Sequence, residues 1–312
     1  MTIGEVIPAY IAYRQSLGEK FRTNRIVLTG FCRYVGSDVE LALVDWNIIS
    51  EYLNAPKGKV TSFWFGKYSA LKGFFTWALS RGYVAKVPLS QELPKRPSHI
   101  VPYIYSNQEL RSLFDSALIY QRRKGHMIPY VTQTILIITY VLGLRKQETL
   151  VLKLKDVDIQ ESLVEIRESK FYKSRIVPFN EDVKQRLEEY LEWRKKSGFP
   201  QEPESALFID DRALPVNIHT FSACFKHIRK KAGISRDDAG IYQPRIQDLR
   251  HTFATNRLKS WYAEQKDVQA LLPILSSYLG HTQLAHTSVY LSMTSDLLKE
   301  ASNRFEIFLG YE

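Results

Sequence analysis

Four segments beyond residue 140 carry side chains that suit phosphodiester chemistry. A phosphodiester under in-line attack develops extra negative charge on its non-bridging oxygens, and a planar guanidinium can bind two of them at once. Arg145 and Arg250 supply two guanidiniums, while His281 and Tyr290 supply an imidazole and an oxygen nucleophile. Each segment alone is a weak signal, so the interpretation depends on all four: GLRKQETLVL (143–152), ESKFYKSRIVPF (168–179), PRIQDLRHTFAT (244–255) and LGHTQLAHTSVY (279–290).

In this order and at these separations, the segments resemble the boxes of the tyrosine recombinase (phage integrase) family. The resemblance depends jointly on GLRKQE, DLRHTFA and the LGH segment followed nine residues later by Tyr290. It implies a site-specific DNA recombinase or integrase that cleaves and rejoins strands through a 3′-phosphotyrosine intermediate. It also implies a two-domain clamp around duplex DNA, in which a helical core-binding domain precedes an α+β catalytic domain. The compact type used by transposons, simple phages and chromosome-dimer resolvases is expected.

The resemblance implies a role for each matching residue. Tyr290 is the nucleophile, and Lys170 in a β-hairpin protonates the departing 5′ oxygen. The transition state is stabilised by Arg145, Arg250 and His281. Because the ester keeps the energy of the broken bond, neither metal nor ATP nor another cofactor is expected. The sequence agrees, since it has no GxxxxGK[ST] loop and no HExxH or CxxC ligand spacing.

Residues close in sequence to Arg145 and Lys170 also bear on these assignments. Glu148 lies one helical turn beyond Arg145 and can orient its guanidinium, which is also the supporting role that the resemblance implies. Lys173 is the alternative to Lys170 if the hairpin turn has a different register.

One position departs from the family pattern. Gln247 stands three residues before Arg250, where the family usually has His. Gln can donate an amide N–H but cannot serve as a general base. His251 follows Arg250 directly, but one residue along a helix turns its side chain by about 100°, so it is not expected to replace that base. The acceptor of the Tyr290 proton therefore stays open, and so does a second function, a DNA-binding regulator or accessory subunit with weak or no cleavage.

Hydrophobic periodicity predicts the elements that would position these residues. A buried helix over 131–142 ends just before Arg145, and alternating residues over 163–179 predict a β-hairpin. Helical patterns cover 106–121, 180–197, 217–232, 247–261, 264–279 and the residues after 287. The predicted fold class is mainly α with a small antiparallel β-sheet in the second domain.

Charge points to a polyanionic partner. The 312-residue chain has a net charge of +10, and residues 1–100 hold 13 Lys and Arg against 7 Asp and Glu. A basic first domain favours nucleic acid, here double-stranded DNA. Lys57, Lys59 and Lys67 beside the aromatic run at 64–68 are candidate DNA-binding residues. The alternative is that the aromatics form a core and the lysines a solvated face.

The same patterns divide the chain. Helical stretches at 3–17, 22–34, 44–53 and 62–79 predict a helical core-binding domain over 1–84. Four prolines interrupt residues 85–102, which are the predicted linker. The catalytic domain covers 103–312 and has a C-terminal helix that docks on a neighbouring subunit or on its own chain.

Composition excludes several other classes of protein. No apolar run reaches the roughly 20 residues of a membrane span, and the N-terminus lacks the pattern of a signal peptide. Cys32 and Cys224 suggest neither a disulfide framework nor a zinc site, so a reducing cytoplasm is expected. The expected assembly is a homotetramer on two DNA sites, with or without a partner recombinase.

Overall fold

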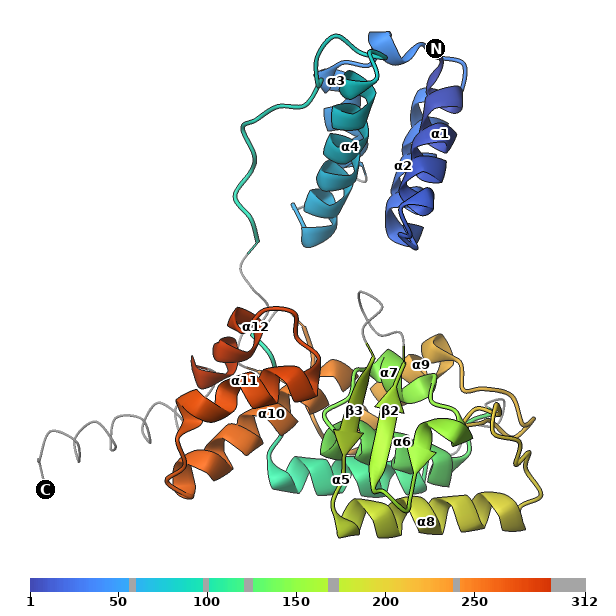
Figure 1. Cartoon of the computed structure of the whole chain (residues 1–312), viewed down its shortest axis with the longest axis vertical. Helices are drawn as coiled ribbons and strands as arrows, with labels where there is room; N and C mark the ends of the chain where they lie inside the picture. Colours follow the sequence, from blue (N-terminus) through green and yellow to red (C-terminus); the bar gives the residue numbers. More distant parts are fainter. Residues whose placement is uncertain (56–59, 98–100, 121–125, 168–173, 238–241, 293–312) are drawn as a thin grey trace, which may run out of the picture. The chain divides into compact units, whose positions relative to one another are not determined.

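The structure is a computed structural model of the whole chain. It describes residues 1–55, 60–97, 101–120, 126–167, 174–237 and 242–292. The chain separates into two compact units, Met1–His99 and Ile100–Glu312 (Figure 1). The boundary between the units falls inside the segment 85–102 that the sequence marks as a linker. The first part of this segment is not free, because Val87 and Leu89 pack on the core of the first unit and the Tyr68 hydroxyl donates to the carbonyl of Ser90.

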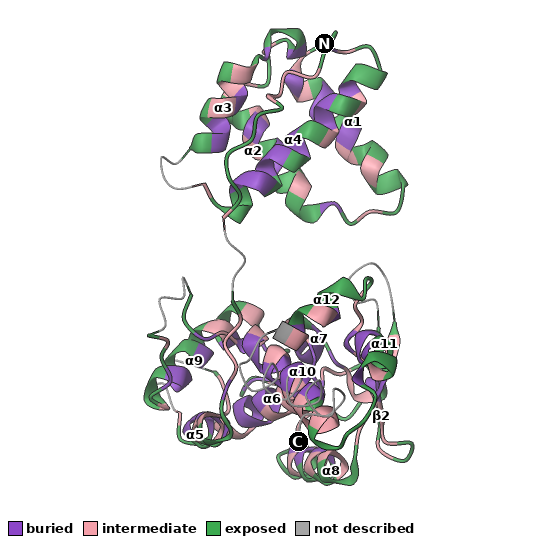
Figure 2. Ribbon diagram, turned by 90° about the vertical axis from the view of Figure 1, so that its left-hand side faces the viewer, coloured by how far each residue is buried: buried purple, intermediate pink, exposed green. Residues whose placement is uncertain are grey.

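The first unit is a four-helix domain. Its helices are α1 (Ile3–Ser16), α2 (Arg22–Val35), α3 (Trp46–Asn54) and α4 (Ser62–Ser80), with a 3₁₀ turn, η1 (Leu41–Leu43), between α2 and α3. Asp45 and Thr61 cap the N-termini of α3 and α4 by accepting backbone N–H bonds, which explains where these helices begin. The buried residues gather along the inner faces of the four helices (Figure 2).

The second unit combines helices with one small sheet. Its strands β1 (Val157–Asp158), β2 (Leu163–Ile166) and β3 (Arg175–Pro178) pair antiparallel in the order β1-β2-β3, with Val164 opposite Val177. The helices before and after it are α5 (Asn107–Leu118), α6 (Pro129–Val141), α7 (Lys146–Leu150), α8 (Glu181–Lys196), α9 (Ile218–Lys231), α10 (Ile246–Ala263), α11 (Val268–Leu279) and α12 (Ala285–Ser288). The predicted fold class is confirmed.

Helix α6 forms the centre of the second unit. Val131, Ile135 and Ile138 are almost fully buried where α6 packs against α5 and α10 (Figures 1 and 2). The hydroxyls of its threonines Thr132 and Thr139 donate to carbonyls four residues earlier, so these polar groups are satisfied inside the core. Within the described residues, no helix has the length and apolarity needed to cross a membrane.

Two details of the chain path differ from the sequence prediction or extend it. Ser106 and Glu109 form a capping box at the start of α5, in the range 106–121 where the sequence predicts a helix. Where the sequence predicts a helix after residue 287, Tyr290 lies in a 3₁₀ turn, η4 (Val289–Ser292), that directly continues α12. The predicted C-terminal helix beyond this turn lies outside the described residues. Neither Cys32 nor Cys224 takes part in a disulfide.

Candidate active site

The first arginine is positioned by a tight helix junction. Helix α6 ends at Val141, and Gly143 then takes a left-handed conformation with φ of +58°. A Cβ atom at Gly143 would lie 2.4 Å from the ring of Phe253 on α10, so both the backbone angle and the close approach require glycine. Arg145 follows as the N-cap residue of α7.

Glu148 joins two arginines. Arg145 donates to this carboxylate from Nη1 at 2.7 Å and from its backbone N at 2.9 Å. Arg175 on β3 binds it with two nitrogens, at 2.8 and 3.1 Å. Glu148 is 6% exposed. Burial opposes its charge, but the bonds and charges of Arg175 and Arg145 outweigh burial and lower the pKa of Glu148 to about 2. The carboxylate therefore holds the guanidiniums of both Arg145 and Arg175 in place.

Arg250 lies on α10 and is 1% exposed. Its Nη1 donates to the carbonyl of Gly143 at 2.8 Å, and its Nη2 donates to the carbonyl of Leu279 and lies 3.2 Å from Nε2 of His281. Arg145 similarly donates to the carbonyl of Gly280 at 3.2 Å. Burial and the charge of Arg145 lower the pKa of Arg250 to about 10, which still leaves it charged at neutral pH. Two guanidiniums thus converge on the junction after α6 and the end of α11.

His281 is placed by the C-cap of α11. Gly280 ends that helix in the left-handed conformation, and His281 follows with Nδ1 2.7 Å from the Thr287 hydroxyl. Its other ring nitrogen faces Arg250. Burial and the charges of Arg250 and Arg145 lower the pKa of His281 to about 3. The imidazole is therefore neutral at neutral pH and acts as a hydrogen-bonding group.

Tyr290 lies against these residues and is 2% exposed. Its hydroxyl is 3.2 Å from Nδ1 of His251, and its ring is nearly parallel to that of His281, with centroids 6.2 Å apart. Burial raises the pKa of Tyr290, while a hydrogen bond and charge from Arg250 and the charge of Arg145 oppose the increase. The structure therefore brings Arg145, Arg250, His281 and Tyr290 together from distant parts of the sequence.

The remaining predicted residues have different positions. Gln247 is half-buried and lines a pocket of about 810 Å³ beside α9; it makes no hydrogen bond to Tyr290, although both residues are described. Lys170 and its alternative Lys173 lie outside the described residues, as do Lys57 and Lys59.

The assignment of Lys67 as a DNA-binding residue needs correction. Lys67 is 8% exposed, and its ammonium donates to the carbonyls of Tyr52 at 2.9 Å and Ala55 at 3.0 Å. It also lies 4.4 Å from the centre of the Tyr52 ring. The neighbouring aromatics Trp64 and Tyr68 are buried and stacked on each other. Lys67 therefore ties α4 to the end of α3 inside the domain and is not available to a phosphate.

Sequence reasoning missed three residues of this site. Arg175 shares the inward face of β3 with buried Val177, so the two-residue period of a strand could have indicated it. Thr287 lies six residues after His281 in a polar stretch with no comparable signal. His251 was set aside because of its angle to Arg250, and the prediction did not include η4, which packs on α10 and brings Tyr290 to His251.

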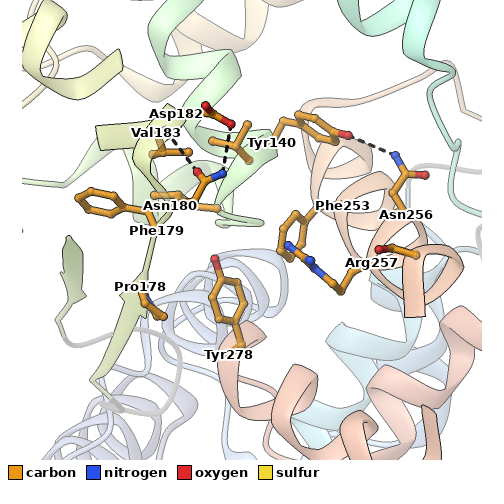
Figure 3. Close-up of a pocket in the computed structure, with 13 residues that line it drawn as sticks. Tyr140, Pro178, Phe179, Asn180, Asp182, Val183, Phe253, Asn256, Arg257 and Tyr278 are labelled. Carbon is orange, nitrogen blue, oxygen red and sulfur yellow. Dashed lines mark hydrogen bonds between the residues drawn. The ribbon is translucent and has the colours of Figure 1, made fainter. Parts of the chain in front are cut away.

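A separate pocket of about 560 Å³ is lined by residues of α6 and α10, by Tyr278 and by the segment where β3 ends and α8 begins (Figure 3). Tyr278 and Phe253 stack in its wall, with ring centroids 5.6 Å apart. The same two residues support the site, because Phe253 packs against Gly143 and the carbonyl of Tyr278 accepts a bond from Arg175 at 2.8 Å. This pocket contains none of the predicted catalytic side chains. The part of the chain that the structure describes holds no cluster of three or more His, Cys, Asp or Glu suited to a metal ion.

The family model of the phage integrase family matches residues 107–296, the range that contains every side chain of this site. This chain belongs to the phage integrase family. A putative integrase/recombinase of Sinorhizobium fredii, y4rB, is 30% identical over 307 residues, which is 98% of this chain and 97% of that relative. The tyrosine recombinase XerC of Lactobacillus delbrueckii subsp. bulgaricus is 29% identical over 229 residues, or 72% of this chain and 70% of XerC.

Solved structures of integrases and recombinases share the fold. The Tn1549 transposon integrase in complex with transposon right end DNA superposes with a TM-score of 0.70 at 17% identity, covering 98% of this chain and 99% of that one. XerH bound to a palindromic difH substrate gives a TM-score of 0.63 at 21% identity, covering 93% of this chain and 80% of XerH. The predicted family and its activity, site-specific recombination by a tyrosine recombinase, are confirmed.

Proposed function

We propose that this phage integrase family member cleaves and rejoins double-stranded DNA with Tyr290 as its nucleophile. The observation that carries the proposal is the position of the Tyr290 hydroxyl, which lies beside Arg250 and His281 in a buried cluster. A tyrosine in one buried cluster with two guanidiniums and an imidazole has what an in-line attack on a phosphodiester needs, namely a nucleophile and stabilisation of the developing charge. The Tyr290 oxygen bonds to phosphorus, and the bond from phosphorus to the 5′ oxygen breaks.

The two arginines bind the scissile phosphate in this proposal. In the free chain they donate to the main-chain carbonyls of Gly143, Leu279 and Gly280. These neutral acceptors already orient the guanidiniums, so an anionic phosphate can replace them with stronger charge-assisted bonds at little cost of reorganisation. His281 is neutral and adds a hydrogen bond to the same phosphate.

Other assignments complete the proposal. Lys170 protonates the 5′ oxygen that leaves, and Gln247 at most donates a hydrogen bond. Residues 1–84 form the core-binding domain, 85–102 the linker and 103–312 the catalytic domain, which together clamp the duplex. Lys57 and Lys59 contact DNA from the first domain. The active assembly is a homotetramer on two DNA sites in the cytoplasm, with or without a partner recombinase. The solved structure of lambda integrase, which shares the fold, is a dimer bound to a COC′ core site.

Covalent capture tests the proposal. Wild-type protein and Tyr290→Phe are incubated with fragmented genomic DNA from the organism that encodes the chain, and the DNA that survives a denaturing wash is sequenced. Adducts that need Tyr290 and gather at one inverted-repeat site are expected. Retention of DNA under native conditions without a denaturation-resistant adduct would contradict the covalent mechanism, provided that no partner recombinase restores cleavage.

One observation favours a second candidate. Gln247 replaces the histidine usual in this family, which suits a DNA-binding regulator or accessory subunit that cleaves poorly. The same capture assay distinguishes the two, because an accessory subunit would form adducts only when an active partner is present, and those adducts would contain the partner's tyrosine.

A further inference from the structure

The hydroxyl of Tyr290 has a specific neighbour besides Arg250. Nδ1 of His251 lies 3.2 Å from the Tyr290 oxygen, and the two rings have centroids 5.6 Å apart at an angle of 52°. The contact exists because η4 packs on α10, so that the turn carrying Tyr290 crosses the helix at the position of His251. This is hydrogen-bond distance between a phenol and an imidazole nitrogen.

Successive residues of α10 serve two sides of the site. Side chains one residue apart point about 100° from each other on a helix. The side chain of Arg250 faces the carbonyls of Gly143 and Leu279, whereas the side chain of His251 faces η4. The guanidinium and the imidazole therefore lie on different sides of the Tyr290 hydroxyl. In this arrangement Arg250 can bind a phosphate while His251 stays in contact with the hydroxyl.

We propose that His251 is the general base that accepts the Tyr290 proton, in the place left by Gln247; this inference rests on the proposed function. In cleavage, the proton passes from the Tyr290 oxygen to Nδ1 of His251 as that oxygen bonds to phosphorus. The bond to the 5′ oxygen breaks, and the oxygen takes a proton from a cationic donor, the role proposed for Lys170. In rejoining, each proton returns and the phenol is released.

The surroundings of His251 keep its imidazole neutral. Burial, together with the charges of Arg245 and Arg250, lowers the pKa of His251 to about 4, although the Asp248 carboxylate opposes this. The neutral ring therefore has a free lone pair at neutral pH. The other titratable groups around it are Tyr290 itself and His281, whose ring stacks on that tyrosine. Gln247, in contrast, cannot accept a proton in any geometry.

The test compares His251→Asn with wild type across pH. Asparagine can still accept a hydrogen bond from Tyr290 but cannot take its proton. The measured quantity is the rate at which denaturation-resistant adduct forms on randomly nicked genomic DNA. Where a nick lies close to the cleaved bond, the short fragment that carries the free 5′ hydroxyl diffuses away, so the strand cannot be rejoined. We expect a loss of roughly 100-fold or more at neutral pH. The variant's rate should then rise about tenfold per pH unit, because hydroxide replaces the missing base, while the wild-type rate stays nearly flat.

A second measurement separates proton transfer from positioning. Replacing Tyr290 by a fluorotyrosine of lower pKa supplies a phenolate without a base, so it should restore the His251→Asn variant far more than it accelerates wild type. His126→Asn is the matched control, since His126 is exposed and pairs with Asp211 away from Tyr290. It should leave both rate and pH profile unchanged.

Other results would overturn the inference. If His251→Asn lowers the rate by the same factor at every pH and fluorotyrosine restores nothing, His251 only positions Tyr290. An unchanged rate would exclude any role. If wild type itself forms no adduct, the proposed function fails first, which is a distinct outcome. If a thermal melt shows that His251→Asn does not fold, His251→Gln is compared with wild type in the same way.

Discussion

Arg250 donates from Nη1 to the carbonyl oxygen of Gly143 across 2.8 Å, which joins α10 to the junction that follows α6. The two residues are 107 positions apart in the sequence. Because Gly143 lies two residues before Arg145, this bond helps to fix the position of the second arginine relative to the first. Arg250 also donates to the carbonyl of Leu279, and Arg145 donates to the carbonyl of Gly280 and to Glu148, so the spacing of the two guanidiniums depends on contacts from several elements.

Substitution of Gly143 should disturb both the fold and the site. Gly143→Ala introduces a side chain at φ of +58° and within 2.4 Å of Phe253. We expect a decrease in the free energy of unfolding of about 3 kcal/mol, from backbone strain plus overpacking. Chemical denaturation followed by fluorescence measures this decrease, and adduct formation should fall as Arg145 is displaced.

Gly233 provides a matched control for the backbone term. It follows α9 with φ of +71°, and a Cβ atom there would meet nothing within 4 Å. Gly233→Ala should therefore cost only about 1 kcal/mol. Equal losses in the two variants would show that the contact with Phe253 does not constrain Gly143.

Replacing Arg250 by lysine should reduce cleavage while the protein still folds. Arg250→Lys keeps the charge but loses the planar fork that reaches two acceptors at once. The rate of adduct formation should fall by roughly 100-fold, with a much smaller change in DNA affinity, because phosphate contacts elsewhere dominate binding. Single-turnover cleavage and a binding titration at one salt concentration separate the two effects.

Arg257 on the same helix serves as the control. It is exposed and lies near the ring of Phe253. Arg257→Lys should leave the cleavage rate within about twofold of wild type, since exposed substitutions rarely exceed about 0.5 kcal/mol. A similar loss in both variants would mean that the assay reports net positive charge and not the geometry of Arg250.

Removal of the Glu148 charge should destabilise the second unit in a pH-dependent way. The folded pKa of Glu148, about 2, lies below its ordinary value of 4.5. Its carboxylate therefore contributes about 3 kcal/mol above pH 4.5 or so, and that contribution is lost as the pH falls toward about 2. Glu148→Gln should unfold at a lower temperature than wild type at pH 7, and the difference should shrink at acid pH.

Glu204 tests whether burial is the deciding factor. Its pKa is also lowered to about 2, by bonds from Lys153 and Lys155, but it is solvent-exposed. Surface pairs are screened by water and salt, so Glu204→Gln should hardly change the melting temperature. A large effect at Glu204, or none at Glu148, would contradict the assignment of Glu148 as the buried support of the arginines.

Lys67 should matter for stability and not for phosphate contacts. Lys67→Met removes two bonds to the carbonyls of Tyr52 and Ala55 in the interior, which should cost about 1 to 3 kcal/mol. The slope of log affinity against log salt should stay unchanged, whereas loss of a phosphate contact would reduce it by about 0.9. Lys72→Met, at an exposed position on α4, is the control for stability and should be nearly neutral.

The sequence by itself determined the family, the fold class and the identity of four residues of the site. Arg145, Arg250, His281 and Tyr290 lie in short segments whose order and local spacing are readable without coordinates. The helices around them were predictable for the same reason, because helical periodicity and caps such as Ser106 are local signals. A strand pattern likewise indicated the hairpin that brings in β3.

Only the tertiary structure decided which other residues contact these four side chains in the site. Arg175 reaches Glu148, and His251 reaches Tyr290, because β3 and η4 pack against other elements. Lys67 points into the first unit because its ammonium binds two carbonyls there, of Tyr52 and Ala55. The local sequence around Lys67 does not reveal these acceptors. Sequence spacing gives the direction of a side chain relative to its own helix or strand, whereas a contact also depends on the element that packs there.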